Sequence, residues 1–424
     1  MPDKICLNNM IDVNTFLLLS GGIFVIGLLG ELIFSKTGIS DTIILLAIGI
    51  AVGPWLGLFE PAALMTVAPF VAPIALMLIL FESGLALNMY KVIYQSPRAI
   101  LLSILDMVFS VAFCALAMNL ALGWDYLSGA LLGAIISGTS SVTVIALVKQ
   151  IKPCDETEDV LVLESVMTDM LTVVVSIALI KVVLAGGFFD VKDLFGDILS
   201  AFSIGAMFGI LGAAVWLYIL HKVHITSPKP MMALASIAIL YAVTEMVGGS
   251  GAISTLFFGI ILGNSTELAN AFRSGPLLVD LSNIKLFQTE ISLFVRTFFF
   301  VYLGAIFVAQ NMLLVMVGLL ISVGLMFTRR FGVFASTFGS KVLRKDSELI
   351  TAIAPRGLAA AVVSQLPLSY GLALARDYME LTLAVIIATT LFSTFLIWLW
   401  KRKSDAKPTA NTDACIVRKK RNSR

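Results

Sequence analysis

Long apolar segments follow one another along almost the whole chain and are separated by short polar connections. Most are about 20 residues long, which lets a helix cross the hydrocarbon core of a bilayer. The pattern predicts an all-α polytopic membrane protein with about 13 transmembrane helices. The segments lie near 14–34, 42–58, 65–88, 98–122, 127–149, 158–184, 197–221, 230–247, 250–263, 288–309, 311–335, 348–373 and 378–400.

Composition agrees with this reading of the pattern. Hydrophobic residues make up 59% of the 424 residues and charged residues only 13%, and the mean hydropathy is +0.99. A soluble domain has far more charge and less apolar sequence, so the lipid bilayer is the expected environment. The net charge of +2 is carried in loops and in the tail. Because no basic face results, no nucleic-acid partner is expected.

The basic residues in the connections predict the orientation of the chain. They fall on one side of the membrane when 13 spans are threaded, and cytoplasmic loops are enriched in Lys and Arg. The N-terminus is therefore expected outside and the C-terminus in the cytoplasm of a cell (plasma) membrane protein. Residues 1–400 form the predicted transmembrane domain, and 401–424 a basic tail expected to be disordered. The basic loop residues are Lys91, Arg98, Lys149, Lys152, Lys222, Lys229, Lys341, Arg344 and Lys345.

Two carboxylates interrupt an apolar span in the segment "LVLESVMTDM", residues 161–170. Helical spacing puts Ser165 and Asp169 on one face, with Glu164 and Thr168 on the neighbouring face. A carboxylate at bilayer depth costs about 2.5–3.5 kcal/mol, so it is expected to face a cavity, an ion or a partner charge. Two structural alternatives stay open, which are a hydrogen bond between helices for Asp169 and an ion pair for Glu164.

Other charged residues lie within predicted spans. Arg296, Arg329, Arg330 and Arg356 are each flanked by apolar sequence, and one of them is expected to neutralise Glu164 because an unpaired buried charge is costly. A further carboxylate, that of Asp106 in the fourth span, is ambiguous from sequence. It could line a cytoplasmic funnel or cap a neighbouring helix.

Two polar, helix-breaking stretches fall in the fifth and twelfth spans. They read "IISGTSSVTV" at 135–144 and "AIAPRGLAA" at 352–360. Broken helices at matching positions of two halves are the sequence pointer to inverted repeats with a binding site at the midplane. Unwound backbone at 137–141 would offer carbonyl and hydroxyl oxygens to a cation. Hydrogen bonding between helices is the alternative for these hydroxyls.

Five motifs together carry a family resemblance. "GTSSVTVI", "LESVMTD", "FVRTFFFVYLG", "TRRFGVF" and "PRG" occur in this order, and the chain thereby resembles the cation:proton antiporters that include archaeal and bacterial sodium/proton exchangers. The likeness covers nearly the whole membrane region. It implies the sodium/proton antiporter fold with two broken crossing helices, exchange of Na⁺ for H⁺ in pH homeostasis, and a homodimer. It implies no cofactor beyond the transported ions.

The resemblance also implies roles for particular residues. Asp169 matches the aspartate that carries cation and proton in turn, Ser165 and Thr139 match oxygen ligands, and Glu164 matches a glutamate held by an arginine at Arg329. Arg356 is the second candidate for this partner. Further candidates near the cation are Thr168 and Ser140, with Asp106 as a secondary site residue.

The sequence departs from the family pattern at two points. Thr168 stands where an asparagine usually precedes the carrier aspartate, and electrogenic relatives have a second aspartate there. One exchangeable carboxylate favours electroneutral exchange of one cation for one proton. The usual Thr-Asp-Pro is replaced by residues 139–141, Thr-Ser-Ser, which removes a negative charge near the ion. Ligand field and number set monovalent selectivity, so K⁺ remains an alternative to Na⁺ and Li⁺.

Other functional classes are weighed by what the sequence lacks. An intramembrane hydrolase would need a general base, yet both histidines lie outside the spans and no HExxH occurs. The chain is therefore not expected to be an enzyme. A passive cation channel and a Na⁺-coupled solute symporter stay open. Flux without proton counterflow would identify the first, and flux that requires an organic solute the second.

Overall fold

A computed structural model describes most of the predicted membrane domain. The described residues are 21–22, 25, 41–57, 61–87, 89, 97–185, 191–222, 229–271, 282–307 and 312–405. Six helices there are long and apolar enough to cross a membrane, and seven shorter apolar helices accompany them. Nearly all of the predicted first span and the tail beyond residue 405 lie outside the described residues.

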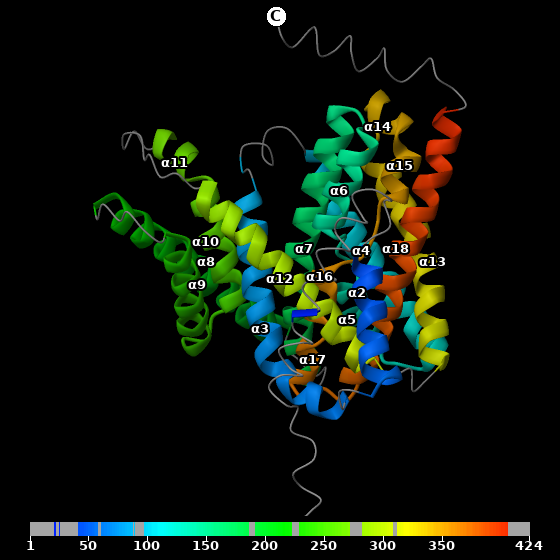
Figure 1. Ribbon diagram of the computed structural model, residues 1–424, viewed down its shortest axis with the longest axis horizontal. Helices are drawn as coiled ribbons and strands as arrows, with labels where there is room; N and C mark the ends of the chain where they lie inside the picture. Colours follow the sequence, from blue (N-terminus) through cyan, green and yellow to red (C-terminus); the bar gives the residue numbers. More distant parts are fainter. Residues whose placement is uncertain are drawn as a thin grey trace, which may run out of the picture.

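The green helices α8, α9 and α10 lie on one side of Figure 1 and belong to a first group of helices that pack against one another. Helix α10 packs against α3 and α8, and α12 packs against α2 and α3. The group comprises α2 (Asp41–Ile50) with the π-helical turn η1 (Ala51–Trp55), α3 (Pro61–Ala86), α8 (Val191–Lys222), α9 (Lys229–Met246), α10 (Gly251–Gly263), α11 (Ser265–Ala271) and α12 (Ser282–Ile306).

The second group contains the helices around the two interruptions. Helix α4 packs against α5, α7 and α13, and α13 packs against α18. The group comprises α4 (Pro97–Leu122), α5 (Tyr126–Ile135), α6 (Ser141–Ile151), α7 (Asp155–Leu184), α13 (Met312–Ser336), α14 (Lys341–Lys345), α15 (Ser347–Ala352), α16 (Leu358–Val363), α17 (Leu366–Ser369) and α18 (Ala375–Asp405).

Both predicted breaks occur where the polar stretches are. Helix α5 ends at Ile135 and α6 starts at Ser141, while α15 ends at Ala352 and α16 starts at Leu358. The two breaks cross, since Thr139 and Arg356 form an isolated antiparallel bridge. Each break is the middle span of a three-span unit, α4 to α7 in one and α13 to α18 in the other. The predicted pair of broken crossing helices is confirmed.

Glycine allows backbone contact at the crossing. A Cβ atom on Gly357 would lie 2.4 Å from the Cβ atom of Ser140, a distance that no side chain tolerates. The amide of Ser140 donates to the carbonyl oxygen of Pro355 at 2.7 Å. The second break can therefore approach the first this closely only with glycine at position 357.

Candidate functional site

Helix α7 carries a buried polar stripe into the centre of the second helix group. Its first turn is acidic, which suits the positive end of the helix dipole. Further along, Glu164, Ser165 and Thr168 are fully buried, and Asp169 is only 5% exposed. The spacing that predicted two adjacent polar faces thus places all four side chains in the protein interior beside the first break.

Asp169 lies against the start of α6, the half-helix that follows the first break. The backbone N–H of Ser141 donates to its Oδ2 at 3.4 Å. Ser141 is the first residue of α6, so its amide has no partner within the helix. The break thereby directs a free backbone amide and the positive end of a helix dipole at the carboxylate.

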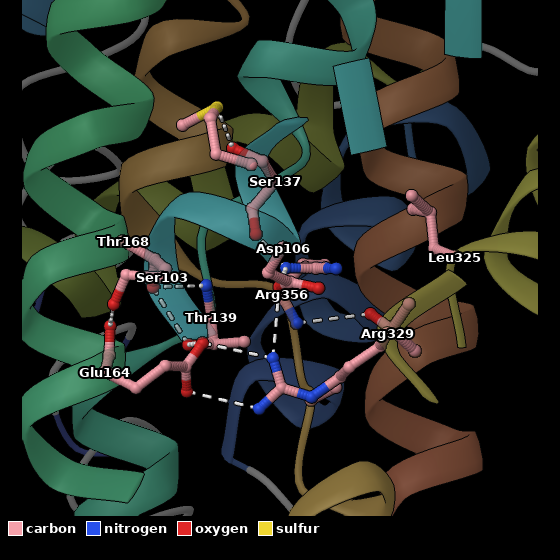
Figure 2. A network of polar contacts seen from close by, with 12 residues as sticks. Ser103, Asp106, Ser137, Thr139, Glu164, Thr168, Leu325, Arg329 and Arg356 are labelled. Atoms are coloured by element: carbon pink, nitrogen blue, oxygen red, sulfur yellow. Dashed lines mark hydrogen bonds and ion pairs between the residues drawn. The ribbon is translucent and has the colours of Figure 1, made fainter. Parts of the chain in front are cut away.

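Glu164 is held by Arg329 of α13. Their two contacts are Nη1 to Oε1 at 3.0 Å and Nη2 to Oε2 at 3.1 Å, and both side chains are fully buried. Figure 2 shows the guanidinium facing the carboxylate. This two-point geometry is what a planar guanidinium makes best. Arg329, and not Arg356, is therefore the arginine that pairs with Glu164.

Arg329 also holds the second break. Its Nε donates to the carbonyl oxygen of Ile350 at 3.3 Å and its Nη2 to that of Ile353 at 3.1 Å. Both carbonyls lie at the end of α15, where helical partners run out. One side chain thus satisfies the backbone at the break while it neutralises Glu164 on another helix.

Asp106 lies between the two arginines. Its Oδ2 accepts from Nη1 of Arg329 at 3.0 Å and lies 3.4 Å from Nη1 of Arg356. Arg356 also donates to the carbonyl oxygen of Ser137 in the first break. Two carboxylates and two guanidiniums, all buried, therefore balance in charge (Figure 2). The ambiguous carboxylate of the fourth span proves to be a central member of this network.

Hydroxyl groups satisfy the remaining backbone amides at the breaks. The N–H of Thr139 donates to Oγ1 of Thr168 at 3.2 Å, and the N–H of Arg356 donates to Oγ1 of Thr389 at 3.2 Å. On α18, Ser393 accepts from the N–H of Ala354 at 3.3 Å. Unwound backbone inside a membrane domain persists only with such partners.

The other residues predicted near the cation make contacts of their own. The hydroxyl of Ser165 donates to the carbonyl oxygen of Val162 at 2.9 Å. That of Ser140 is the N-cap of α6 and pairs with Thr143. Thr139 Oγ1 lies 3.2 Å from Oε1 of Glu164 and 3.0 Å from the hydroxyl of Thr168.

The sequence analysis did not single out Ser141 or Thr389. For Ser141 a signal existed, since a serine directly follows the N-cap position of the half-helix and ends the Thr-Ser-Ser run. For Thr389 there was none, because it belongs to an apolar helix and meets Arg356 only through folding. Arg296 lies on α12 and the exposed Arg330 on α13.

Two broken helices that cross at a buried, charge-balanced network, with a separate buried carboxylate at one break, define a secondary transporter of the inverted-repeat kind. The family model described as sodium/hydrogen exchanger, transmembrane, matches residues 21–402. The chain belongs to this family, which is a family of transporters.

Curated relatives and a solved structure agree with the family assignment. The Na(+)/H(+) antiporter 1 of Methanocaldococcus jannaschii is 25% identical over 353 residues, covering 80% of each chain. The K(+)/H(+) antiporter NhaP of Alkalimonas amylolytica is 25% identical over 90% of this chain, which spans 65% of that protein's length. The structure of the sodium proton antiporter MjNhaP1 from M. jannaschii at pH 8 superposes with a TM-score of 0.74 at 24% identity, covering 90% of this chain and 98% of that chain.

Proposed function

We propose that the protein exchanges Na⁺ for H⁺ across the membrane, with Asp169 as the carrier of both ions. The observation that carries this proposal is the difference between Asp169 and the two carboxylates of the buried network. Asp106 and Glu164 are engaged by arginines, whereas Asp169 accepts a hydrogen bond from the backbone N–H of Ser141 at the helix break. Asp169 can therefore exchange this hydrogen bond for a proton or a cation without breaking the charge balance of the network.

Competition for one carboxylate produces the exchange. A proton and a desolvated alkali cation cannot occupy Asp169 together. A hard cation takes several oxygen ligands, and those proposed here are Asp169, Ser165, Thr139, carbonyl oxygens of the break and water. Thr168 and Ser140 are secondary candidates. Glu164 and Arg329, with Asp106 and Arg356, hold the two breaks in register and are not carriers.

Alternating access would follow from movement of the second helix group against the first. Helices α3 and α12 contact α16 across the boundary between the groups, so a rocking motion there would expose Asp169 first to one side and then to the other. Because a single exchangeable carboxylate is proposed, each cycle moves one cation for one proton. The exchange is then electroneutral.

The choice of Na⁺ over K⁺ rests on how much of each relative's own length this chain covers. The relative named as a Na⁺/H⁺ antiporter is matched over 80% of both chains, while the one named as a K⁺/H⁺ antiporter is matched over 65% of its own length. K⁺/H⁺ exchange is the second candidate, favoured by the neutral Ser140, which weakens the field at the break. Li⁺ is a further expected substrate because, like Na⁺, it is a small, hard cation that takes oxygen ligands.

The remaining proposals concern the protein in its membrane. We place it in the cell membrane, as a homodimer that contributes to pH homeostasis, with the C-terminus cytoplasmic. The C-terminal end of α18 and the basic helix α14 lie at the same end of the molecule (Figure 1), as the positive-inside rule requires. Residues 401–424 would then form a cytoplasmic tail. A C-terminal epitope should be reached only in permeabilised cells, and the purified protein should have the mass of a dimer.

Ion exchange in proteoliposomes tests the function. Acid-loaded vesicles receive Na⁺, K⁺ or Li⁺, and proton efflux is followed with an internal pH dye for the wild type, Asp169→Asn and Asp155→Asn. Asp155 is an exposed aspartate at the start of the same helix and serves as the matched control. We expect Na⁺-dependent efflux that is insensitive to an imposed membrane potential, and that is abolished only in Asp169→Asn.

Four results would contradict the proposal or its choice of ion. Full exchange by Asp169→Asn would remove the assigned carrier. Cation flux without proton movement would indicate a channel, and flux that requires an organic solute would indicate a symporter. Efflux with K⁺ alone would leave Asp169 as the assigned carrier, but the transported cation would be K⁺ and not Na⁺.

A further inference from the structure

Ser141 differs from the other hydroxyl residues at the first break in what it touches. Ser165 donates within its own helix, to Val162, and Ser140 is occupied as the N-cap of α6. Thr139 is bonded to Glu164 and Thr168. Among these four residues, only Ser141 is hydrogen bonded to Asp169, through its backbone N–H at 3.4 Å, which places its hydroxyl beside the same carboxylate.

A hydroxyl beside a carboxylate can serve two states of the site. It carries one rotatable hydrogen and two lone pairs. Without a cation, the hydroxyl hydrogen of Ser141 would turn toward the carboxylate of Asp169. With a cation, rotation about the C–O bond turns a lone pair toward the ion, and Oγ and Oδ2 can bridge it together. No large backbone movement is needed, because the amide of Ser141 already lies 3.4 Å from Oδ2 of Asp169.

We propose that Ser141 Oγ is a ligand of the transported cation, shared with Asp169, and that it sets the affinity for the cation. This inference rests on the proposed function. The family's Thr-Asp-Pro has an aspartate where this chain has Ser140. In our proposal, the hydroxyl oxygen of the next residue, Ser141, takes the place of the lost carboxylate oxygen. This additional neutral oxygen would then restore part of the attraction for the cation that was lost with the carboxylate.

The local backbone permits substitutions that separate the two donors of Ser141. Ser140 has φ −67° and ψ 107°, an extended conformation that a following proline accepts. Proline is well tolerated at the first position of a helix, where the amide has no intrahelical partner. Ser141→Pro thus removes the hydroxyl and the N–H, Ser141→Ala removes the hydroxyl alone, and Ser141→Thr retains both.

The test measures the apparent KM for Na⁺ and the maximum rate in proteoliposomes for these three variants. Ser236→Ala is the matched control, since Ser236 donates only to Met232 of its own helix α9. We expect the KM to rise about three- to tenfold in Ser141→Ala and Ser141→Pro, the size of one lost polar contact, with a much smaller change in maximum rate. Ser141→Thr and Ser236→Ala should retain the wild-type KM.

A second measurement reads cation binding without transport. Na⁺ should raise the melting temperature of the detergent-solubilised wild type and of Ser141→Thr, and should need a higher concentration to do so in Ser141→Ala. If Ser141→Pro fails to fold, the comparison of alanine with threonine decides the question alone.

Two outcomes would overturn the inference while leaving the proposed function intact. One is a wild-type KM in all three variants, and the other is a raised KM in Ser141→Pro alone, which would assign the effect to the amide. In both cases the wild type exchanges ions and Asp169→Asn does not. Absence of exchange by the wild type would instead overturn the proposed function and this inference with it.

Discussion

At the scale of single residues, the buried charges of Asp106, Glu164, Arg329 and Arg356 are meaningful only as a set. Removing one partner of a buried pair leaves an uncompensated charge, which costs about 3–5 kcal/mol, whereas a complete neutral set is close to break-even against apolar packing. Each of these four residues is therefore needed to balance the charges of the other three. This structural role does not require any of them to bind the transported ion.

The contact of Asp106 with Arg356 gives a prediction at this scale. Asp106→Asn and Arg356→Gln should each destabilise the protein, because the first leaves an excess positive charge and the second an excess negative one. The double variant is neutral again and should lose about 1–3 kcal/mol less than the sum of the singles, the usual coupling of contacting charges. Unfolding of the four proteins in detergent measures this. Additive losses would show that the pair is not coupled.

At the scale of elements, the broken helices persist because α18 supplies acceptors for them. Thr389 and Thr390 both donate to carbonyl oxygens of their own helix at 2.7 Å, and both are buried. Only Thr389 also accepts from the amide of Arg356. The two neighbours thus form a matched pair that differs in one contact to the break.

This pair yields a second prediction. Thr389→Val retains the shape of the side chain but removes its hydroxyl oxygen. The buried N–H of Arg356 then loses its acceptor, which should lower the stability of the protein by about 1–3 kcal/mol. Thr390→Val loses only its local bond and should cost less. Melting temperatures in detergent compare the two variants. Equal shifts would mean that Thr389 does not support the break.

At the scale of the whole molecule, the first helix group is built on close backbone approach between α3 and α10. A Cβ atom on Gly259 would lie 2.6 Å from the carbonyl oxygen of Phe81, and one on Gly84 would lie 2.5 Å from that of Leu256. Glycine removes the side chain that would keep the two helices apart. The group can thereby form a firm support for movement of the second group.

A third prediction concerns this packing. Gly259→Ala should cost about 1–3 kcal/mol by overpacking and lower the melting temperature. Gly196→Ala on α8 is the control, because a Cβ atom there meets nothing within 4 Å; the better helix propensity of alanine should leave its stability equal or slightly higher. If Gly259→Ala and Gly196→Ala had equally lowered melting temperatures, the close approach of α3 and α10 would not explain the loss of stability in Gly259→Ala.

The sequence by itself determined the local features of this protein. Apolar segments of membrane length predicted the spans, and helical spacing put Ser165 with Asp169 and Glu164 with Thr168. Glycine among serine and threonine residues predicted the first break, and proline with glycine predicted the second. Each of these features depends on residues within about one or two turns of one another, where periodicity and backbone preference act.

The tertiary structure alone decided the long-range partners. Arg329 meets Glu164 over 165 residues of sequence, and Asp106 meets Arg329 and Arg356 over 223 and 250 residues. Ser141 reached Asp169, and Thr389 reached Arg356, only when separate helices packed. A local sequence pattern indicates that a buried charge or amide needs a partner. The identity of that partner depends on how the helices pack, and local periodicity does not encode helix packing.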